Sequence, residues 1–160
     1  MIRLVGMLVV ITCCGALGVK KSSELKCRRR ELEALRQMLF DIGAALQYNC
    51  ASTAEIVRML KAGGRMKFFS QLDYTDLAGT LMRSSEYRSL YINDPERQII
   101  ADVFENLGSS DIETQIAMIE FGEHRLDAAI DACEKECAEK CRLYNSLGFL
   151  GGIFISLLII

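Results

Sequence analysis

Two uncharged, hydrophobic segments lie at opposite ends of this 160-residue chain. The first covers residues 4–19 and the second covers residues 147–160. As helices rising 1.5 Å per residue they would be about 24 and 21 Å long, slightly shorter than the roughly 30 Å hydrocarbon core of a bilayer. We therefore expect a transmembrane anchor at residues 1–19, a water-soluble body at residues 20–146, and a second membrane segment at residues 147–160. Because both segments are short, we also expect local thinning of the bilayer or pairing of the two segments.

The first segment has a second interpretation, as a secretory signal peptide. Only Arg3 precedes it, no Ala-x-Ala site follows it, and Lys20 and Lys21 occupy the position where cleavage would fall. A lipoprotein site at Cys13 is disfavoured because Thr12 stands where Ala or Gly is preferred. These flanking residues favour a retained anchor.

Basic residues are distributed unequally around the first segment. Arg3 precedes it, whereas six basic residues follow it closely: Lys20, Lys21, Lys26, Arg28, Arg29 and Arg30. The positive-inside rule then places the body in the cytoplasm, with both termini on the other side of the membrane. The same cluster can also touch anionic lipid headgroups. Nucleic-acid binding is not expected, because the formal net charge is only −2 and no motif accompanies the cluster.

Glycines recur in both hydrophobic segments. Gly15 and Gly18 lie in the first, and Gly148 and Gly152 form a G-x-x-x-G pattern in the second. Such spacing lets two helix backbones approach closely in lipid, so we expect these four residues to form a membrane helix packing face. The alternative is that glycine is simply common in membrane helices.

The body has the composition and periodicity of a helical domain. Leu25, Leu32, Leu35, Leu39, Ile42 and Leu46 form a stripe of apolar residues at helical spacing. No run of alternating β-branched residues with turn pairs suggests a sheet. Short loops between the expected helices favour an all-α antiparallel bundle, flanked by the two transmembrane helices.

Helix caps divide the body into segments. Ser52 and Glu55 form a capping box that opens a second helix, which ends at Gly63-Gly64. A helical piece at residues 66–72 would turn Phe68 and Phe69 toward the core, and Asp73 or Thr75 would cap a helix reaching about Tyr91. Asp94 is the expected cap of the next helix, with Pro95 in its first turn. Ser110 and Glu113 form a further capping box, opening a helix of about 33 residues whose apolar stripe includes Ile112, Ile116, Ile119, Leu126, Ile130, Cys133, Cys137 and Tyr144.

The sequence contains no recognisable catalytic or metal-binding pattern. Cys133, Cys137 and Cys141 repeat every four residues, but structural zinc sites favour C-x-x-C pairs and four ligands. Buried thiols that pack as small hydrophobic groups explain the same spacing. Seven cysteines in no disulfide pattern fit a reducing compartment. His124 is the only histidine, and no nucleophile lies at a recognisable spacing from it, so we expect no enzyme, no cofactor and no bound metal.

The whole chain resembles a known family. The residues that carry this resemblance are the leucine-striped helix ending in Tyr48, the element Leu107-Gly108-Ser109-Ser110-Asp111 with Gln115 after it, and the closing run from Leu143 to Gly152. These are similar to stage III sporulation protein AB of endospore-forming bacteria. The chain departs from that family after Tyr48, where Asn49-Cys50-Ala51-Ser52 replaces the usual Gly-Thr-Pro-Leu, although the Ser52 capping box can supply the turn.

The resemblance implies a role in sporulation. The family's soluble body is similar to the cytoplasmic domains of the inner-membrane platform protein of type II secretion and type IV pilus systems. It implies a non-enzymatic platform subunit in the mother-cell membrane around the forespore, within the channel that joins the two cells. The implied partners are a secretion-type ATPase, ring-forming channel proteins, the lipid bilayer and further copies of the chain. Two other hypotheses remain: a generic two-anchor membrane scaffold or regulator, and a cysteine-based metal sensor.

Overall fold

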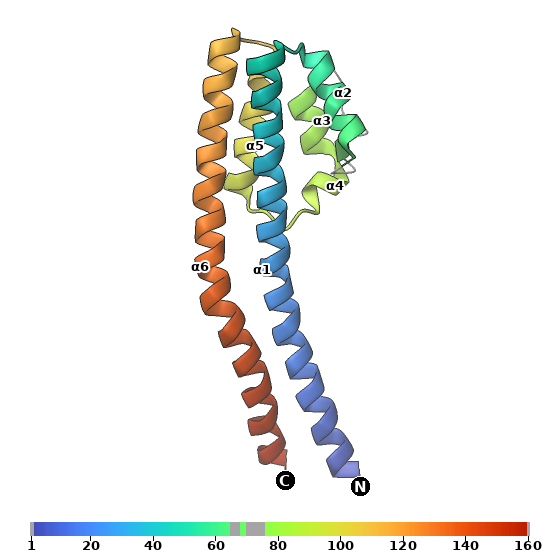
Figure 1. The fold of residues 1–160 in the computed structure, drawn as a ribbon. Helices are drawn as coiled ribbons and strands as arrows, with labels where there is room; N and C mark the ends of the chain where they lie inside the picture. Colours follow the sequence, from blue (N-terminus) through green and yellow to red (C-terminus); the bar gives the residue numbers. More distant parts are fainter. Residues whose placement is uncertain (1, 65–67, 70–75, 160) are drawn as a thin grey trace. The chain divides into compact units, whose positions relative to one another are not determined.

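The computed structural model describes residues 2–64, 68–69 and 76–159. Regular structure in this part of the chain is entirely helical, which confirms the predicted all-α fold. Its elements are α1 (Ile2–Asn49), α2 (Thr53–Gly63), α3 (Leu77–Arg83), α4 (Ser85–Arg88), α5 (Asp94–Asn106) and α6 (Ile112–Ile159) (Figure 1). Side chains are described from Val19 to Lys140, with the same gaps, and at Ser146.

The chain divides into two compact units. Unit 1 comprises residues 1–29 and 131–160, and unit 2 comprises residues 30–130. The helices α1 and α6 are 48 residues long each and contribute to both units, so the division falls inside helices and not in loops.

The core of unit 2 is built around the predicted leucine stripe. Leu32, Leu35, Leu39, Ile42 and Leu46 are all buried in α1. The helices α1, α5 and α6 meet at Gly122 of α6, where an added Cβ would lie 3.1 Å from side-chain atoms of both Leu39 and Val103. The absence of a side chain at Gly122 therefore allows three helices to approach closely.

A second cluster of aromatic side chains completes this core. Phe68 and Phe69 are buried as predicted, and the ring of Phe68 meets that of Tyr87 edge-on, with 5.4 Å between the ring centroids. The remaining residues of the predicted helical piece at 66–72 lie outside the described part of the chain, apart from these two.

The ends of α1 and α2 follow from local residue chemistry. Cys50, with a positive φ of 46°, turns the chain out of α1. The side chain of Ser52 accepts a hydrogen bond from the backbone of Glu55, and the carboxylate of Glu55 accepts one from the backbone N–H of Ser52. Gly64 ends α2 in the left-handed conformation, at φ 58°, which glycine adopts at little cost.

The helix predicted to run to about Tyr91 is wrong in extent. Asp76 caps α3 by accepting a hydrogen bond from the N–H of Gly79, and the extended backbone of Ser84 separates α3 from α4. Ser84 itself caps α4, since its side chain accepts a hydrogen bond from the N–H of Tyr87. The predicted caps Asp73 and Thr75 lie outside the described residues.

Two other predicted caps are displaced by one residue. Asn93 is the N-cap of α5, so Asp94 is instead its first helical residue; the backbone N–H of Asn93 donates to Glu96 over 2.7 Å. For α6, Asp111 accepts from the N–H of Thr114 at 3.0 Å, which replaces the predicted box of Ser110 and Glu113. In each case two capping residues stand side by side, and the one whose position matches the helix start serves as the cap.

No helix in the part of the chain with described side chains is long and apolar enough to cross a membrane. The two predicted spans, residues 4–19 and 147–160, lie outside that part except for Val19. The predicted packing face of Gly15, Gly18, Gly148 and Gly152 lies outside it as well.

Candidate functional site

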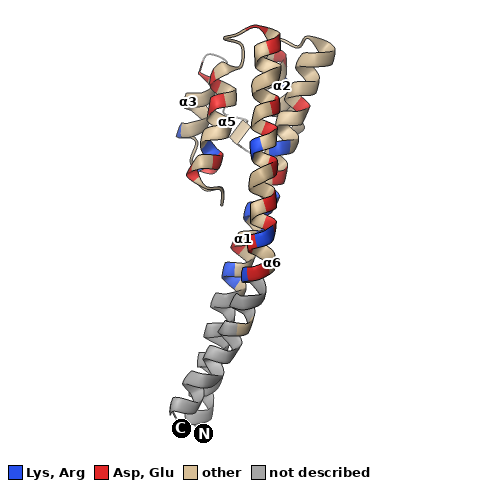
Figure 2. Ribbon diagram, turned by 90° about the vertical axis from the view of Figure 1, so that its left-hand side faces the viewer, with Lys and Arg blue, Asp and Glu red and all other residues tan. Residues whose placement is uncertain are grey.

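In unit 1, α1 and α6 are joined by ion pairs just beyond the hydrophobic segments. Arg28 contacts Glu136 at 3.1 Å and Arg29 contacts Glu134 at 2.6 Å. Figure 2 shows basic and acidic residues side by side where these helices run together. Part of the basic cluster is therefore neutralised by carboxylates of the other long helix. The side chain of Arg28 is only 16% exposed, so this pair is the better shielded from solvent.

Glu136 is the centre of this charged contact. Its carboxylate also binds Lys140 one turn further along α6, at 2.5 Å. The hydrogen bond from Lys140 is the main reason that the pKa of Glu136 lies below its usual value, and Arg28 adds to the effect. Glu136 therefore loses its proton at a lower pH than an unpaired glutamate does.

The cysteine face of α6 packs against α1 within unit 1. Cys133 is buried and its Sγ lies 3.7 Å from the backbone oxygen of Leu25, while Cys137 is half-buried. The side chain of Cys141 lies outside the described residues. No cluster of three or more His, Cys, Asp or Glu side chains suited to a metal occurs in the part that the structure describes.

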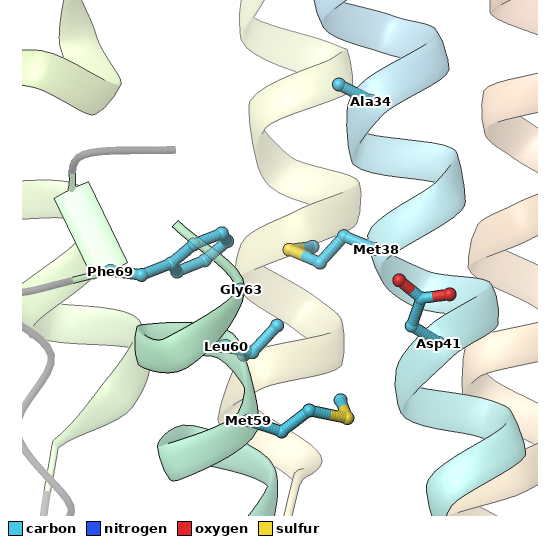
Figure 3. Close-up of a pocket in the computed structure, with 7 residues that line it drawn as sticks. All are labelled: Ala34, Met38, Asp41, Met59, Leu60, Gly63 and Phe69. Carbon is cyan, nitrogen blue, oxygen red and sulfur yellow. The ribbon is translucent and has the colours of Figure 1, made fainter. Parts of the chain in front are cut away.

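An apolar pocket of about 240 Å³ lies between α1 and α2 in unit 2 (Figure 3). Met38 of α1, Leu60 of α2 and Phe69 point toward one another across it, and Asp41 lies at its edge. Asp41 accepts a hydrogen bond from Gln37 one turn earlier in α1, at 3.0 Å. This lining suits an apolar side chain better than a charged small molecule.

The family-like element at residues 107–111 forms a tightly bonded loop before α6. Gly108 has a φ of +86°, and a Cβ at this position would collide with Oγ1 of Thr53. Gln115 is buried, accepts from the N–H of Gly108 at 3.2 Å and donates to the carbonyl of Ser110 at 2.6 Å. Thus Gln115 holds the loop against the start of α6.

Arg97 closes a second loop, and sequence reasoning missed it. Its guanidinium donates to four backbone carbonyl groups, two at the end of α4 and two in the turn that follows, including those of Tyr87 at 2.6 Å and Leu90 at 2.7 Å. The hydroxyl of Tyr87 donates in turn to the carbonyl of Arg97 at 3.1 Å. Burial raises the pKa of Tyr87 well above its usual value, so this hydroxyl keeps its proton. No local spacing could have shown that one arginine serves four carbonyls.

Two further predicted positions fall on the surface of α6. His124 is exposed, on the polar side of the helix. Ile112, which its spacing places in the predicted apolar stripe, is 46% exposed. The buried residue at this end of α6 is instead the polar Gln115. The stripe is therefore wrong at its first residue but correct at Ile119, Leu126 and Cys133, which are all buried.

Comparison with known protein families decides the family of the chain. The family model for stage III sporulation protein AB matches residues 3–160. The chain belongs to the stage III sporulation protein AB family. This membership confirms the resemblance found in the sequence and implies a role in sporulation. Searches of curated proteins and of solved structures gave no match.

Proposed function

We propose that this member of the stage III sporulation protein AB family is a non-enzymatic platform subunit of the membrane apparatus that joins mother cell and forespore. The family supports the role in sporulation. The two hydrophobic segments support a membrane position, and the basic cluster after the first supports a cytoplasmic body.

The observation that carries the proposal is the charged contact of unit 1. The pairs Arg28–Glu136 and Arg29–Glu134 tie α1 to α6 just beyond the two hydrophobic segments. The paired residues lie 9 to 13 positions outside the hydrophobic segments, or about 14 to 20 Å of helix, so the contact holds the two helices side by side on the proposed cytoplasmic side of the membrane. A helical body fixed at both ends in this way suits a platform on which cytoplasmic and membrane components assemble.

The membrane position and the orientation are tested together by labelling Cys50, which is exposed in unit 2. In sporulating cells that produce the full chain, a membrane-impermeant maleimide should modify Cys50 only after the cells are opened. The Cys50→Ser variant gives the background labelling. Labelling of intact cells, or release of the chain from membranes by alkaline carbonate, would contradict the proposed anchoring.

The platform role is tested through the implied cytoplasmic partner, a secretion-type ATPase encoded beside the chain. Crosslinking in sporulating cells should recover this ATPase with the full chain. The charge-reversed variant Arg28→Glu, which weakens the contact between α1 and α6, should recover less. If the ATPase is absent while the chain is expressed and membrane-bound, the platform role is refuted and a general scaffold remains.

A further inference from the structure

A groove between α1 and α6 in unit 2 has an unusual surface for a water-soluble body. Phe40 and Tyr48 of α1 are 52% and 79% exposed, although aromatic side chains are costly to leave in water. Both line this groove, which has a volume of about 180 Å³. Ile116 and Ile119 of α6 form its other apolar wall.

The groove runs along α1 for long enough to hold a helix over it. Gly43 and Ala44 form its α1 side between the two aromatic residues, and α6 closes its floor, since a Cβ at Gly43 would lie 3.3 Å from the side chain of Ile119. The α1 part runs from Phe40 to Tyr48, which is about 12 Å of helix, or just over two turns. A helix lying over the groove would therefore set its apolar side chains against the exposed faces of Phe40, Ala44 and Tyr48.

The charge along the groove is acidic. Glu120 and Glu123 line it on α6, and Asp127 follows one turn later. Arg36, the basic residue nearest in α1, is already paired with Asp127 at 2.9 Å. Burial raises the pKa of Glu123, and the charges of Asp127 and Glu120 raise it further, while Arg36 and, to a smaller extent, His124 lower it. These crowded carboxylates favour a cationic partner and disfavour a second copy of the same groove, which would bring like charges together.

We propose that the α1–α6 groove docks a helix of another protein, which presents apolar side chains to Phe40, Ala44 and Tyr48 and a lysine or arginine to Glu120 and Glu123. The apolar side chains bury the exposed aromatic residues of α1, and the cation relieves the repulsion between the carboxylates of α6. This proposal does not depend on the membrane platform role.

Photo-crosslinking of the full chain in sporulating cells tests the docking site. The probe is p-benzoylphenylalanine in place of Gln47, an exposed residue at the edge of the groove. The control places the same probe at Phe121, which is 62% exposed and lies about 150° around α6 from the centre of the groove lining, at 100° per residue. We expect a crosslink from position 47 to a helical peptide with apolar residues and a Lys or Arg within one turn, and none from position 121.

Charge reversal then distinguishes specific docking from chance proximity. Glu120→Lys with Glu123→Lys should lower the crosslink yield about tenfold, because two attractions become repulsions. Glu105→Lys, an exposed change on α5, should leave the yield unchanged. Exchange of the partner's Lys or Arg for Glu should restore the yield with the double variant. Should the double variant fail to fold, Glu120→Gln with Glu123→Gln should still lower the yield about threefold.

Several results would overturn the proposal. The first is that position 47 crosslinks only to this chain itself or to lipid. The second is a crosslink yield from position 47 no higher than that from position 121. The third is a crosslink yield from position 47 that the charge changes do not alter in folded variants. A separate comparison of Phe40→Ser with Phe121→Ser must also show a loss only for Phe40, since both side chains are similarly exposed but only Phe40 lines the groove.

Discussion

Gly108 has two separate physical reasons to be glycine, and a double-mutant cycle can separate them. Its φ of +86° is a conformation that residues with a Cβ rarely adopt, which makes Gly108→Ala cost about 1–2 kcal/mol through the backbone alone. The added methyl group would also collide with Oγ1 of Thr53 and lie 3.4 Å from its Cβ. Overpacking of this kind costs about 1–3 kcal/mol. We therefore expect Gly108→Ala to lower the free energy of unfolding by about 2–5 kcal/mol.

The cycle uses urea unfolding of the full chain in detergent micelles, followed by circular dichroism. Thr53→Ala removes the colliding Oγ1, so the double variant should recover about 1 kcal/mol relative to the sum of the single changes. Gly63→Ala is the matched control, because a Cβ there meets no atom within 4 Å and the substitution should be neutral or slightly stabilising. Strict additivity would refute the collision, and a Gly108→Ala change below about 0.5 kcal/mol would refute the backbone argument as well.

Two other predictions concern charged groups. Arg28→Glu should destabilise the contact between α1 and α6 by about 1 kcal/mol, and adding Glu136→Arg should restore most of that stability. A double-mutant cycle of urea unfolding measures both effects. If the second change restores no stability, the ion pair contributes nothing. The carboxylate of Glu31 accepts a hydrogen bond from the N–H of Tyr91 at 2.5 Å, but its burial raises the pKa of Glu31. The folded state therefore binds the Glu31 proton more tightly than the unfolded state does. As a result, the contribution of Glu31 to stability falls as the pH rises above the ordinary pKa of glutamate. Glu31→Gln should therefore gain stability relative to the wild type between pH 4 and pH 7, measured as the difference in urea midpoint, and a constant difference would contradict this reasoning.

The features that could be predicted from the sequence are those set by near neighbours in the chain. The leucine stripe of α1 depends only on helical spacing, and the Ser52–Glu55 box and Gly64 act within one turn. The one-residue errors at Asp94 and Ser110 arise because a capping residue precedes or follows each, and sequence gives both the same propensity. The structure decides between them by where the first helical turn starts.

The features missed from the sequence depend on the folded shape of loops and on the packing of separate helices, which spacing within one helix does not reveal. The four carbonyl groups that accept hydrogen bonds from Arg97 belong to residues 87–92 and converge only once the turn after α4 has formed. Burial of the polar Gln115 is favourable only because the loop at Gly108 and Ser110 supplies both of its hydrogen bonds. The groove at Phe40 and Tyr48 also requires α6, since neither aromatic residue stands out from the pattern of α1 alone.

The paired arginines change how the basic cluster should be understood in the proposed membrane orientation. The positive-inside rule depends on lysines and arginines close to the first membrane segment, not on net charge. Glu134 and Glu136 lie more than a hundred residues after Arg28 and Arg29. If the proposed first anchor inserts during synthesis, both arginines would therefore act with their full charge in setting its orientation. In the folded chain they are paired with these carboxylates, so an attraction of the cluster to an anionic surface would depend mainly on its other basic residues.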